Sequence, residues 1–278
     1  MKRIYIVNPI SGKGRSLKIA REIKNICLAK KLDFQMIETK EPSDATKIAK
    51  AFDQPDNIVF SVGGDGTLNE IVNGIHKASI SIIPSGTGND FYKTITEETN
   101  KIDLGIINNR YFINIAALGI DALIALKGNQ LKEKGFDKLS YPLGILSALK
   151  DYEAFDTSLG KFWILAICNG QSYGGGFQIA PFAENQDGYL DLCMIKNISF
   201  LKLFKVFLKI IQVTHADSTF FKHYQIEGLT IYSEEPMICN VDGEIIKSCE
   251  YRFGIEKSAL QYYHEQDLDL QKVITRKN

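Results

Sequence analysis

The eight residues from Gly63 to Glu70 have a composition that suits the binding of a phosphate group. Their sequence is Gly-Gly-Asp-Gly-Thr-Leu-Asn-Glu, and they follow an apolar, β-branched run, Asn57 to Val62, that predicts a buried strand. Glycine lets the backbone approach a ligand closely, and the start of the helix predicted after the turn offers unpaired N–H groups to an anion. Asp65 does not favour a phosphate by its own charge, so we expect it to hold a cation or to align another group. The alternative is a tight turn in which Asp65 is only a local cap.

Two other loops of similar composition follow short apolar runs. The loop from Asn8 to Gly14, with Lys13 inside it and Arg15 just after it, offers N–H groups, a hydroxyl and cations at the start of a predicted helix. Its spacing is not that of a Walker A loop. The loop from Pro84 to Asp90 offers hydroxyl and amide groups to a phosphate or a nucleotide ring. Each loop alone is also compatible with a surface turn, and the three together favour a ligand site.

The elements that must position these loops alternate between strand and helix in the first third of the chain. Strands are predicted at Ile4 to Val7, Phe34 to Glu38, Asn57 to Val62 and Ile80 to Ile83, and helices at Ser16 to Lys31, Ser43 (as N-cap) to Phe52, and Leu68 to His76. This alternation predicts a mainly parallel sheet with right-handed crossovers. Ligands of such sheets bind at the carboxyl ends of the strands, and all three glycine-rich loops leave those ends.

From about Ile102 onward, strand-like runs separated by turn signals predict an antiparallel β domain. The predicted strands are Lys101 to Ile107, Tyr111 to Ala117, Lys161 to Asn169, Tyr189 to Ile195, Gln225 to Tyr232, Met237 to Val241 and Tyr251 to Ile255. Asp187-Gly188 and Asp242-Gly243 are turn signals, and the second predicts a hairpin. Helical stretches are expected at Leu123 to Tyr152 and Ser199 to Val213, and the polar end from about Asp267 is expected to fray.

Composition excludes several classes of protein. The 278 residues fit two domains or one large one, and 33 basic residues balance 33 acidic ones, which argues against a nucleic-acid partner. The five cysteines are scattered without the spacing of a zinc site or a closed disulfide set, as in a cytosolic protein. The four histidines show no ligand spacing. With neither a signal peptide nor a membrane-spanning run in the sequence, we expect a cytoplasmic protein that is soluble or peripheral to a membrane.

Taken together, the motifs resemble the diacylglycerol kinase catalytic-domain family, which includes bacterial lipid kinases and the sphingosine and ceramide kinases. The matching segments are Asn8-Pro9-x-Ser11-Gly12, Gly63 to Glu70, Pro84 to Phe91, Asn114 to Ala122, Asp187 to Asp191, and Asp242-Gly243-Glu244. They cover nearly the whole chain in the expected order. NAD kinases and phosphofructokinases look similar at Gly-Gly-Asp-Gly-Thr, but the Asn69-Glu70 extension, the third loop and the late Asp-Gly-Glu distinguish this chain from them.

The resemblance implies an α/β + β architecture with an active site in the cleft between two domains. The first, residues 1–110, is expected to be a three-layer α/β domain like that of NAD kinases and phosphofructokinases. The second, residues 111–255, is expected to be an antiparallel β-sandwich that receives the lipid. Residues from about 256 to 278 can pack back on the first domain.

The resemblance also implies site residues for ATP and Mg²⁺. The implied ATP-binding residues are Asn8, Pro9, Ser11, Gly12, Thr39, Gly63, Gly64, Asp65, Gly66, Thr67, Asn69, Glu70, Ser85, Gly86, Thr87 and Asn89. The implied structural Mg²⁺ site comprises Glu184, Asp187 and the backbone carbonyl of Tyr189, oxygen ligands that suit a hard cation; a solvated acidic loop is the alternative.

Three acids are the candidate catalytic residues. An acid of the Asp-Gly-Glu segment is expected to accept the proton of the lipid hydroxyl; we favour Glu244, with Asp242 binding metal or orienting it. Asp65 is assigned the organisation of Mg²⁺ and the ATP phosphates. Lys13 and Arg15 are weaker candidates for neutralising the transferred phosphate.

The stretch from Ser199 to Val213 is the candidate membrane contact. Lys202, Lys205 and Lys209 form one helical stripe in an otherwise apolar segment, and a basic amphipathic helix can lie on an anionic bilayer. The alternative is a helix packed on the β domain with its lysines outward. A homodimer is possible, and the sequence does not identify the oligomeric state.

The sequence thus predicts an ATP- and Mg²⁺-dependent kinase of a lipid hydroxyl, most simply diacylglycerol giving phosphatidic acid. The alternatives are a kinase of another acceptor (a sphingoid base, ceramide, or a soluble substrate such as NAD) and a non-catalytic lipid or nucleotide sensor. Acyl-chain selectivity depends on a pocket shape that the strand pattern does not reveal.

Overall fold

The computed structural model describes residues 1–120, 122–124, 126–127 and 155–275, and the chain divides into two compact units. One unit joins Met1–Leu104 to Glu256–Asn278, and the other is Gly105–Ile255. Most of the helix expected from Leu123 to Tyr152 lies outside the described residues. Asp121, which belongs to the matching segment from Asn114 to Ala122, also lies outside them. Within the described ranges, no helix is both long enough and apolar enough to cross a membrane.

The first unit is built on a four-stranded parallel sheet with the order β2-β1-β3-β4. Its strands are β1 (Lys2–Val7), β2 (Phe34–Glu38), β3 (Asn57–Gly63) and β4 (Ser79–Pro84). Its helices are α1 (Arg15–Ala29), α2 (Asp44–Ala51), α3 (Asp65–Val72) and α7 (Leu268–Ile274), with 3-10 turns at Ser11–Gly14 and Phe91–Thr94. The strand predictions agree to within two residues, and the predicted alternation and parallel pairing are confirmed.

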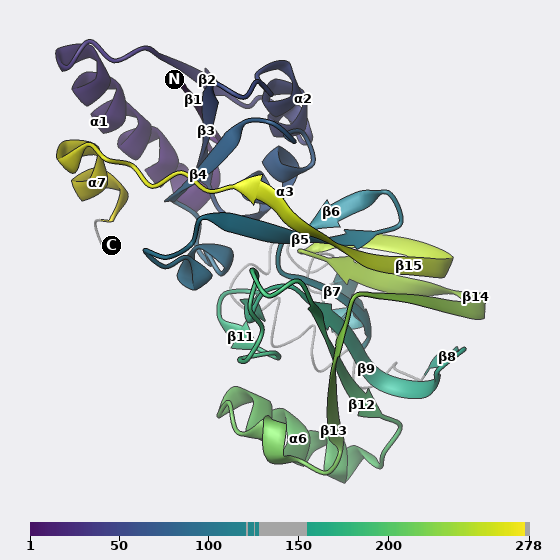
Figure 1. Cartoon of the computed structure of the whole chain (residues 1–278). Helices are drawn as coiled ribbons and strands as arrows, with labels where there is room; N and C mark the ends of the chain where they lie inside the picture. Colours follow the sequence, from purple (N-terminus) through teal and green to yellow (C-terminus); the bar gives the residue numbers. More distant parts are fainter. Residues whose placement is uncertain (121, 125, 128–154, 276–278) are drawn as a thin grey trace. The chain divides into compact units, whose positions relative to one another are not determined.

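Helices cover both faces of this sheet, so the unit has three layers. Figure 1 shows α1 and α7 together on one side and α2 and α3 on the other. On the α1 side, Tyr5 and Phe60 stack with their ring centroids 4.5 Å apart, and Ile23 and Leu270 complete a buried cluster with them. The central strands are buried on both faces, as expected for a parallel sheet.

Three local predictions in this unit are wrong. The helix predicted from Leu68 to His76 is α3, Asp65–Val72, which begins three residues and ends four residues earlier than expected. The chain does not fray from Asp267, because the Asp267 carboxylate accepts the backbone N–H groups of Asp269 and Leu270 and caps α7. Ser43 does not cap α2 with its side chain; it adopts a left-handed backbone, φ 67°. The carboxylate of Asp44 instead accepts the N–H groups of the preceding turn.

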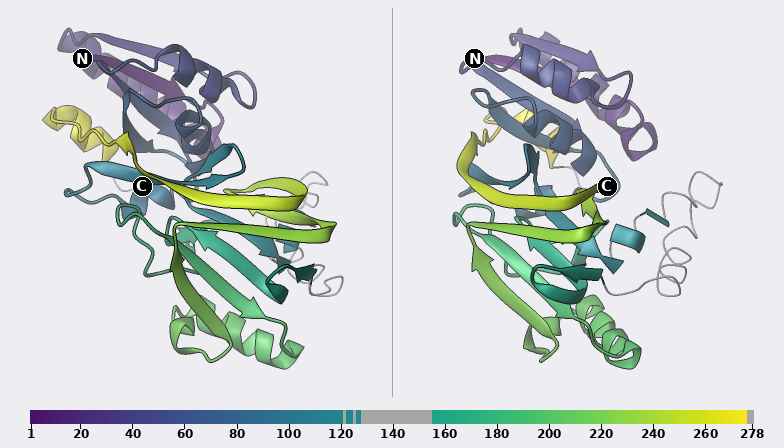
Figure 2. Two further views of the ribbon diagram at one scale, coloured as in Figure 1. Left: turned by 45° about the vertical axis from the view of Figure 1, so that its right-hand side comes forward. Right: turned by 90° about the vertical axis from the view of Figure 1, so that its right-hand side faces the viewer.

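The second unit is an antiparallel β-sandwich formed by a nine-stranded sheet whose order is β13-β12-β9-β7-β14-β15-β5-β6, with β8 paired to β9 (Figure 2). The strands are β5 (Lys101–Ile107), β6 (Arg110–Phe112), β7 (Ile115–Gly119), β8 (Phe155–Thr157), β9 (Gly160–Cys168), β12 (Leu190–Lys196), β13 (Phe221–Ile226), β14 (Gly228–Val241) and β15 (Glu244–Gln261). β5 and β15 begin or end in the first unit. A small hairpin joins β10 (Ser172–Tyr173) to β11 (Phe177–Gln178), and helix α6 (Phe200–Ile211) is followed by a 3-10 turn, His215–Asp217.

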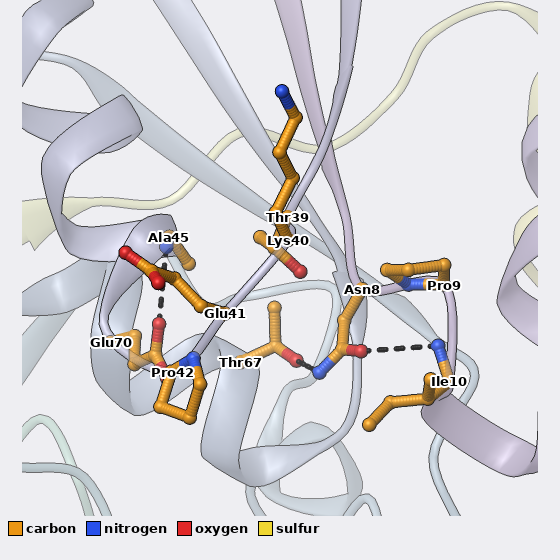
Figure 3. Close-up of a pocket in the computed structure, with 10 residues that line it drawn as sticks. All are labelled: Asn8, Pro9, Ile10, Thr39, Lys40, Glu41, Pro42, Ala45, Thr67 and Glu70. Atoms are coloured by element: carbon orange, nitrogen blue, oxygen red, sulfur yellow. Dashed lines mark hydrogen bonds between the residues drawn. The ribbon is translucent and has the colours of Figure 1, made fainter.

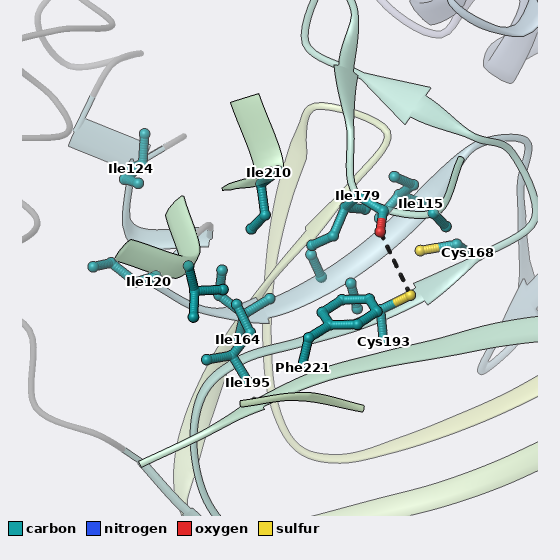
Figure 4. Packing of buried hydrophobic residues seen from close by; sticks show 14 of the residues in the cluster. Ile115, Ile120, Ile124, Ile164, Cys168, Ile179, Cys193, Ile195, Ile210 and Phe221 are labelled. Carbon is teal, nitrogen blue, oxygen red and sulfur yellow. Dashed lines mark hydrogen bonds between the residues drawn. The ribbon is translucent and has the colours of Figure 1, made fainter. Parts of the chain in front are cut away.

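The sandwich has two apolar layers. Side chains from both ends of the sheet order, among them Met194 of β12 and Phe112 of β6, meet in one cluster, so the sheet folds over on itself. The opposite face of β9 and β12 packs against α6 through Ile210 (Figure 4). The expected antiparallel β-sandwich is confirmed.

Four strand predictions here have the wrong extent. The strand expected from Met237 to Val241 is the end of the longer β14, and the one expected from Tyr251 to Ile255 is the middle of β15, Glu244–Gln261. The other two contain breaks. The strand expected from Tyr111 to Ala117 is broken at Ile113 and Asn114, between β6 and β7. The strand expected from Gln225 to Tyr232 is likewise two strands, with the break at Glu227. Apolar residues continue on both sides of each break (Phe112 and Ile115, Ile226 and Leu229), which is why the pattern did not reveal them.

Candidate functional site

The three glycine-rich loops of the first unit leave neighbouring strands at the same edge of the sheet. β1 ends at Val7, which lies opposite Val62, and β3 ends at Gly63, which lies opposite Pro84 of β4. The backbone N–H of Asn8 donates to the Val62 carbonyl at 3.0 Å, and the N–H of Ser85 donates to the Gly63 carbonyl at 2.9 Å. The sheet pairing therefore continues into the loops and holds them together.

The loops pack on one another through bare backbone. A Cβ atom on Gly12 would lie 2.0 Å from the Ser85 carbonyl oxygen, and one on Gly86 would lie 2.5 Å from the Gly64 Cα. Gly12 also has φ +57°, which disfavours other residues. Gly12 and Gly86 therefore let the loops contact each other. The sequence pattern alone did not distinguish this role from contact with a ligand.

Side chains also connect the loops. The Asn8 amide donates to the Thr67 hydroxyl at 3.1 Å, joining the first loop to helix α3. Arg15, a weak candidate for neutralising phosphate, donates to the Pro84 carbonyl at 3.0 Å and so connects the first loop to the third. The Asn89 side chain makes a hydrogen bond with each backbone group of Gly86, which fixes the shape of the third loop.

The Asp65 carboxylate lies between the second and third loops. Its two oxygens accept the backbone N–H groups of Asp90 at 3.0 Å and Phe91 at 2.9 Å. Asp65 is also the first residue of α3. The sequence led us to expect that Asp65 holds a cation or aligns another group. In this conformation it aligns the end of the third loop.

A pocket of about 210 Å³ opens beside the first two loops (Figure 3). It is lined by Asn8, Pro9, Ile10, Thr39, Lys40, Glu41, Pro42, Ala45, Thr67 and Glu70. The pocket thus lies at the carboxyl ends of β1 and β2 and beside α3. Glu70 shapes one wall, because its carboxylate accepts the N–H of Ala45 at 3.1 Å and so caps α2.

The implied ATP-binding residues fall into two groups. Asn8, Pro9, Thr39, Thr67 and Glu70 line the pocket. The other members of the implied set lie outside the lining: Ser11, Gly12, Gly63, Gly64, Asp65, Gly66, Asn69, Ser85, Gly86, Thr87 and Asn89. Of these, Asn69 and Ser85 are buried and Thr87 is exposed.

Five lining residues were missed by the sequence reasoning. Four of them, from Lys40 to Ala45, follow the carboxyl end of β2 directly after Thr39. The rule that places ligands at carboxyl ends of parallel strands would have indicated them. The fifth, Ile10, is 82% exposed and forms an apolar wall.

The lining has the chemistry of a nucleotide subsite. Proline and isoleucine side chains offer apolar walls to a flat ring, while Asn8, Thr39 and Thr67 offer polar groups to its edge. Pockets for drug-sized ligands range from about 300 to 1,000 Å³. At about 210 Å³, the pocket is therefore smaller than a site that encloses such a ligand.

In the second unit, the Asp242-Gly243 hairpin prediction is confirmed: Val241 pairs with Glu244 around this two-residue turn, whose φ angles are +49° and +96°. The Asp242 carboxylate accepts the backbone N–H groups of Ile113, Asn114 and Ile115 at 2.6, 3.0 and 2.9 Å. The break between β6 and β7 is therefore the place where Asp242 binds the backbone. With both oxygens engaged, Asp242 is a structural clamp in this conformation.

Glu244 differs from Asp242 in its surroundings. Its side chain is 57% exposed, and one carboxylate oxygen lies 2.6 Å from Nη1 of Arg110. Its side-chain oxygens therefore remain open to solvent and to a substrate, while the arginine limits the directions in which the carboxylate can point. Of the two acids, Glu244 is the one whose carboxylate is exposed.

The residues of the implied Mg²⁺ site lie in the turn before β12. Asp187 accepts the N–H of Tyr189 at 2.9 Å and the side-chain amide of Gln225 at 3.0 Å, so both its oxygens have donors. Within the residues that the structure describes, no three acidic, histidine or cysteine side chains converge as a metal site. The oxygen donors suit Mg²⁺ chemically, but a cation would have to compete with the Gln225 amide at Asp187.

A buried acid that the sequence reasoning did not single out lies beside this turn. Asp191 is 2% exposed and contacts Nε2 of His223. Burial raises the pKa of Asp191, and the negative charges of Asp187 and Glu184 raise it further, although the His223 contact opposes both effects. His223 is therefore not incidental, as the sequence suggested, but the partner of a buried carboxyl group.

Comparison with known proteins assigns both parts of the chain. The diacylglycerol kinase catalytic domain matches residues 2–112, and the YegS C-terminal NAD kinase beta sandwich-like domain matches residues 114–264. A "Probable lipid kinase YegS-like" of Shewanella frigidimarina is 31% identical over 72% of this chain and 74% of its own length. A "Diacylglycerol kinase" of Staphylococcus saprophyticus is 26% identical over 98% of this chain and 99% of its own length.

Solved structures share the fold. The crystal structure of a diacylglycerol kinase from Bacillus anthracis str. Sterne has a TM-score of 0.68 at 23% identity and covers 95% of this chain and 97% of that one. A second crystal structure from that organism has a TM-score of 0.75 at 25% identity and covers 95% of each chain. These family matches agree with the motifs and the loops described above, and so do the 31% identity and the shared fold. The chain therefore belongs to the diacylglycerol kinase catalytic-domain family.

Proposed function

We propose that this protein is an ATP-dependent lipid kinase that transfers the γ-phosphoryl group to a lipid hydroxyl, most simply that of diacylglycerol. The observation that carries the proposal is the pocket formed by Asn8, Thr39 and Thr67 where β1, β2 and α3 meet. It lies at the edge of the sheet where parallel α/β folds bind ligands, directly beside the first two of the three packed glycine-rich loops.

On the donor side, the pocket receives the nucleoside part of ATP and the loops receive its phosphates. The first turn of α3 supports this assignment, because its N–H groups are oriented toward an anion that approaches Gly66. Apart from its chain neighbours and the backbone of α3 itself, no atom of the described residues lies within 4 Å of the position that a Gly66 Cβ would take. Backbone at Gly66 is thus open to a phosphate, whereas the backbone at Gly12 and Gly86 is occupied by the other loops.

On the acceptor side, Glu244 takes the proton of the lipid hydroxyl. The bond between the γ-phosphorus and its bridging oxygen breaks, a new phosphorus–oxygen bond forms to the hydroxyl, and ADP leaves. Glu244 supports this role by its exposed carboxylate and its ion pair with Arg110. Positioned general bases typically contribute about 10² to 10⁴ in rate.

Mg²⁺ belongs to the proposal through its chemistry with ATP. When bound, it neutralises charge on the phosphates of the nucleotide, as kinases require. Asp65 acts on this part of the site indirectly, by holding the third loop through the amides of Asp90 and Phe91. The acceptor is inferred from the relatives, whose names include lipid kinase and diacylglycerol kinase.

Radiolabelled ATP tests the proposal directly. Diacylglycerol, a sphingoid base, ceramide and NAD are offered in detergent micelles with Mg²⁺, and ATP binding is measured separately by calorimetry. We expect label in diacylglycerol. Label only in NAD would contradict the lipid assignment, and ATP binding without transfer to any acceptor would favour a sensor.

A pair of matched variants connects activity to the pocket. Thr39→Phe places an aromatic ring in the pocket and should abolish measurable ATP binding. Thr230→Phe makes the same change at an exposed position of β14 and should leave binding unchanged. Equal ATP affinity in both variants would exclude the pocket as the nucleoside site.

A further inference from the structure

Helix α6 has an outward apolar side in addition to the side that packs on its sheet. Leu203, Val206 and Ile210 are at most 4% exposed and belong to the buried cluster that Figure 4 shows. On the other side, Leu201, Phe204 and Leu208 are exposed by 76%, 52% and 44%. The helix therefore carries a buried apolar stripe and an exposed one.

The outward stripe has a regular geometry. Leu201, Phe204 and Leu208 are spaced by three and four residues, so they lie above one another on one side of the helix. Each is followed by a lysine, which gives a second stripe of Lys202, Lys205 and Lys209 about 100° around the helix. The basic stripe therefore runs along one flank of the exposed apolar stripe, between it and the buried one. On the other flank lies the half-buried Phe207, whose ring contacts that of Phe177.

The three lysines are not neutralised by neighbouring acids. Within the described residues, none of their ammonium groups forms an ion pair; Lys202 Nζ lies 5.3 Å from the centroid of the Phe220 ring. From Lys196 to Lys222 the sequence has five lysines and one acid, Asp217, although the whole chain balances 33 basic with 33 acidic residues. The positive charge is thus concentrated in this segment.

Packing on the sheet explains only part of the helix. A helix that merely covers the sandwich needs the stripe of Leu203, Val206 and Ile210 and tolerates lysines elsewhere. It does not need a leucine, a phenylalanine and a leucine aligned in solvent. Single exposed apolar residues are ordinary, whereas a continuous apolar stripe beside a row of cations matches the side of a helix that lies in an anionic bilayer interface.

We propose that the outward side of α6, formed by Leu201, Phe204 and Leu208 with Lys202, Lys205 and Lys209, docks the protein on an anionic lipid bilayer. The apolar side chains enter the acyl boundary and the lysines contact the lipid headgroups. The biological purpose rests on the proposed function, since a lipid acceptor is found in a membrane. The docking itself is a binding property that can be measured without ATP or an acceptor.

Vesicle co-sedimentation tests the charge. The wild-type protein should bind vesicles of phosphatidylcholine with phosphatidylglycerol, bind phosphatidylcholine alone much more weakly, and lose binding as salt rises. Lys202→Gln/Lys205→Gln/Lys209→Gln should weaken partition roughly a hundredfold, because each lysine near an anionic surface contributes about fivefold. Lys18→Gln/Lys24→Gln/Lys50→Gln removes the same charge from exposed positions of α1 and α2 and should bind like the wild type.

Two measurements test the apolar stripe. Leu201→Ser/Phe204→Ser should lower partition at least tenfold, while Leu28→Ser/Leu268→Ser, at similarly exposed leucines, should not. In a Phe204→Trp variant, bromine-labelled acyl chains should quench fluorescence beyond the background of Trp163 in the wild type. All α6 variants should retain wild-type turnover of acceptor in detergent micelles, which separates this proposal from the proposed function.

Three results would overturn the proposal: no wild-type binding to anionic vesicles, equal binding by the α6 variants and their controls, or no added quenching in the Phe204→Trp variant on bound vesicles. If the α6 variants instead changed the oligomeric mass in solution with vesicle binding intact, the surface would be an interface with a second copy. Loss of micellar turnover in all proteins, with docking intact, would contradict only the kinase assignment.

Discussion

The carboxylate of Asp242 lies 2.6 Å from the backbone nitrogen of Ile113, which is 129 residues earlier in the chain. The same carboxylate accepts the next two backbone N–H groups, and the Asp242 N–H donates to the Ile115 carbonyl at 3.0 Å. Asp242 therefore holds the β14–β15 turn against the break between β6 and β7, although its motif assigned it to binding metal or to orienting Glu244. Loss of activity on changing Asp242 would consequently not establish a role in chemistry.

Asp242→Ala should lower the free energy of unfolding by about 3 kcal/mol or more. The substitution leaves three backbone N–H groups of buried residues without their charged acceptor, and one such group costs about 1 to 3 kcal/mol. Urea unfolding measures the change. Glu244→Ala, two residues away and exposed, should shift stability by less than about 0.5 kcal/mol. Similar stabilities for the two variants would show that the clamp contributes little.

Glu244→Gln should keep the fold and lower kcat at least a hundredfold with little change in KM, because the amide cannot accept the proton. Arg110→Gln tests the ion pair. An exposed pair contributes at most about 1 kcal/mol to stability, so unfolding should barely change while kcat falls several-fold through a less constrained Glu244. Full activity in Glu244→Gln would remove the residue from the mechanism.

Two glycine-to-alanine variants separate loop packing from phosphate binding. Gly86→Ala places a methyl group 2.5 Å from the Gly64 Cα and should lower stability by about 1 to 3 kcal/mol. The added methyl group of Gly66→Ala contacts no described atom outside its chain neighbours and the backbone of α3. The free energy of unfolding should therefore stay the same or rise, since alanine favours a helix by about 0.5 to 1 kcal/mol over glycine. Calorimetry of Gly66→Ala should nevertheless show ATP affinity at least tenfold weaker. Unchanged affinity would mean that no phosphate approaches the start of α3.

The meeting of the three glycine-rich loops in the first unit could be predicted, because it depends on the local alternation of strands and helices. Parallel strands place their carboxyl ends together, so three loops recognised one by one had to meet. The contacts of Asp65 and Asp242 could not be predicted in this way. Each carboxylate binds backbone N–H groups, which every residue offers, so the partners have no signature in the sequence.

The same reason explains the errors in strand extent and in helix ends. β6 and β7 are separated because Asp242 engages the amides between them, and that acceptor is supplied from the distant β14–β15 turn. Helix α7 is stabilised by its cap and by Lys30, which directly follows α1 and whose ammonium lies 2.7 Å from Asp267. Local composition predicted a frayed end because the stabilising partner lies 237 residues away.

Asp53 should make stability depend on pH in the acidic range. One of its oxygens accepts the backbone N–H groups of His76, Lys77 and Ala78 at 2.7 to 2.9 Å, where the chain enters β4. Partial burial alone would raise the pKa of this carboxyl group, but the three amides outweigh burial and lower the pKa below its ordinary value. The carboxylate therefore stabilises the folded state above the unfolded pKa, and this contribution disappears as pH falls through the folded pKa. We expect Asp53→Asn to cost about 1 kcal/mol at pH 7, allowing for the solvent that reaches the group, and almost nothing near pH 2. Asp56→Asn, at an exposed neighbour, should show no such difference in urea unfolding at either pH. An Asp53→Asn difference that stayed constant with pH would show that the hydrogen-bond geometry, not the charge, carries the stabilisation.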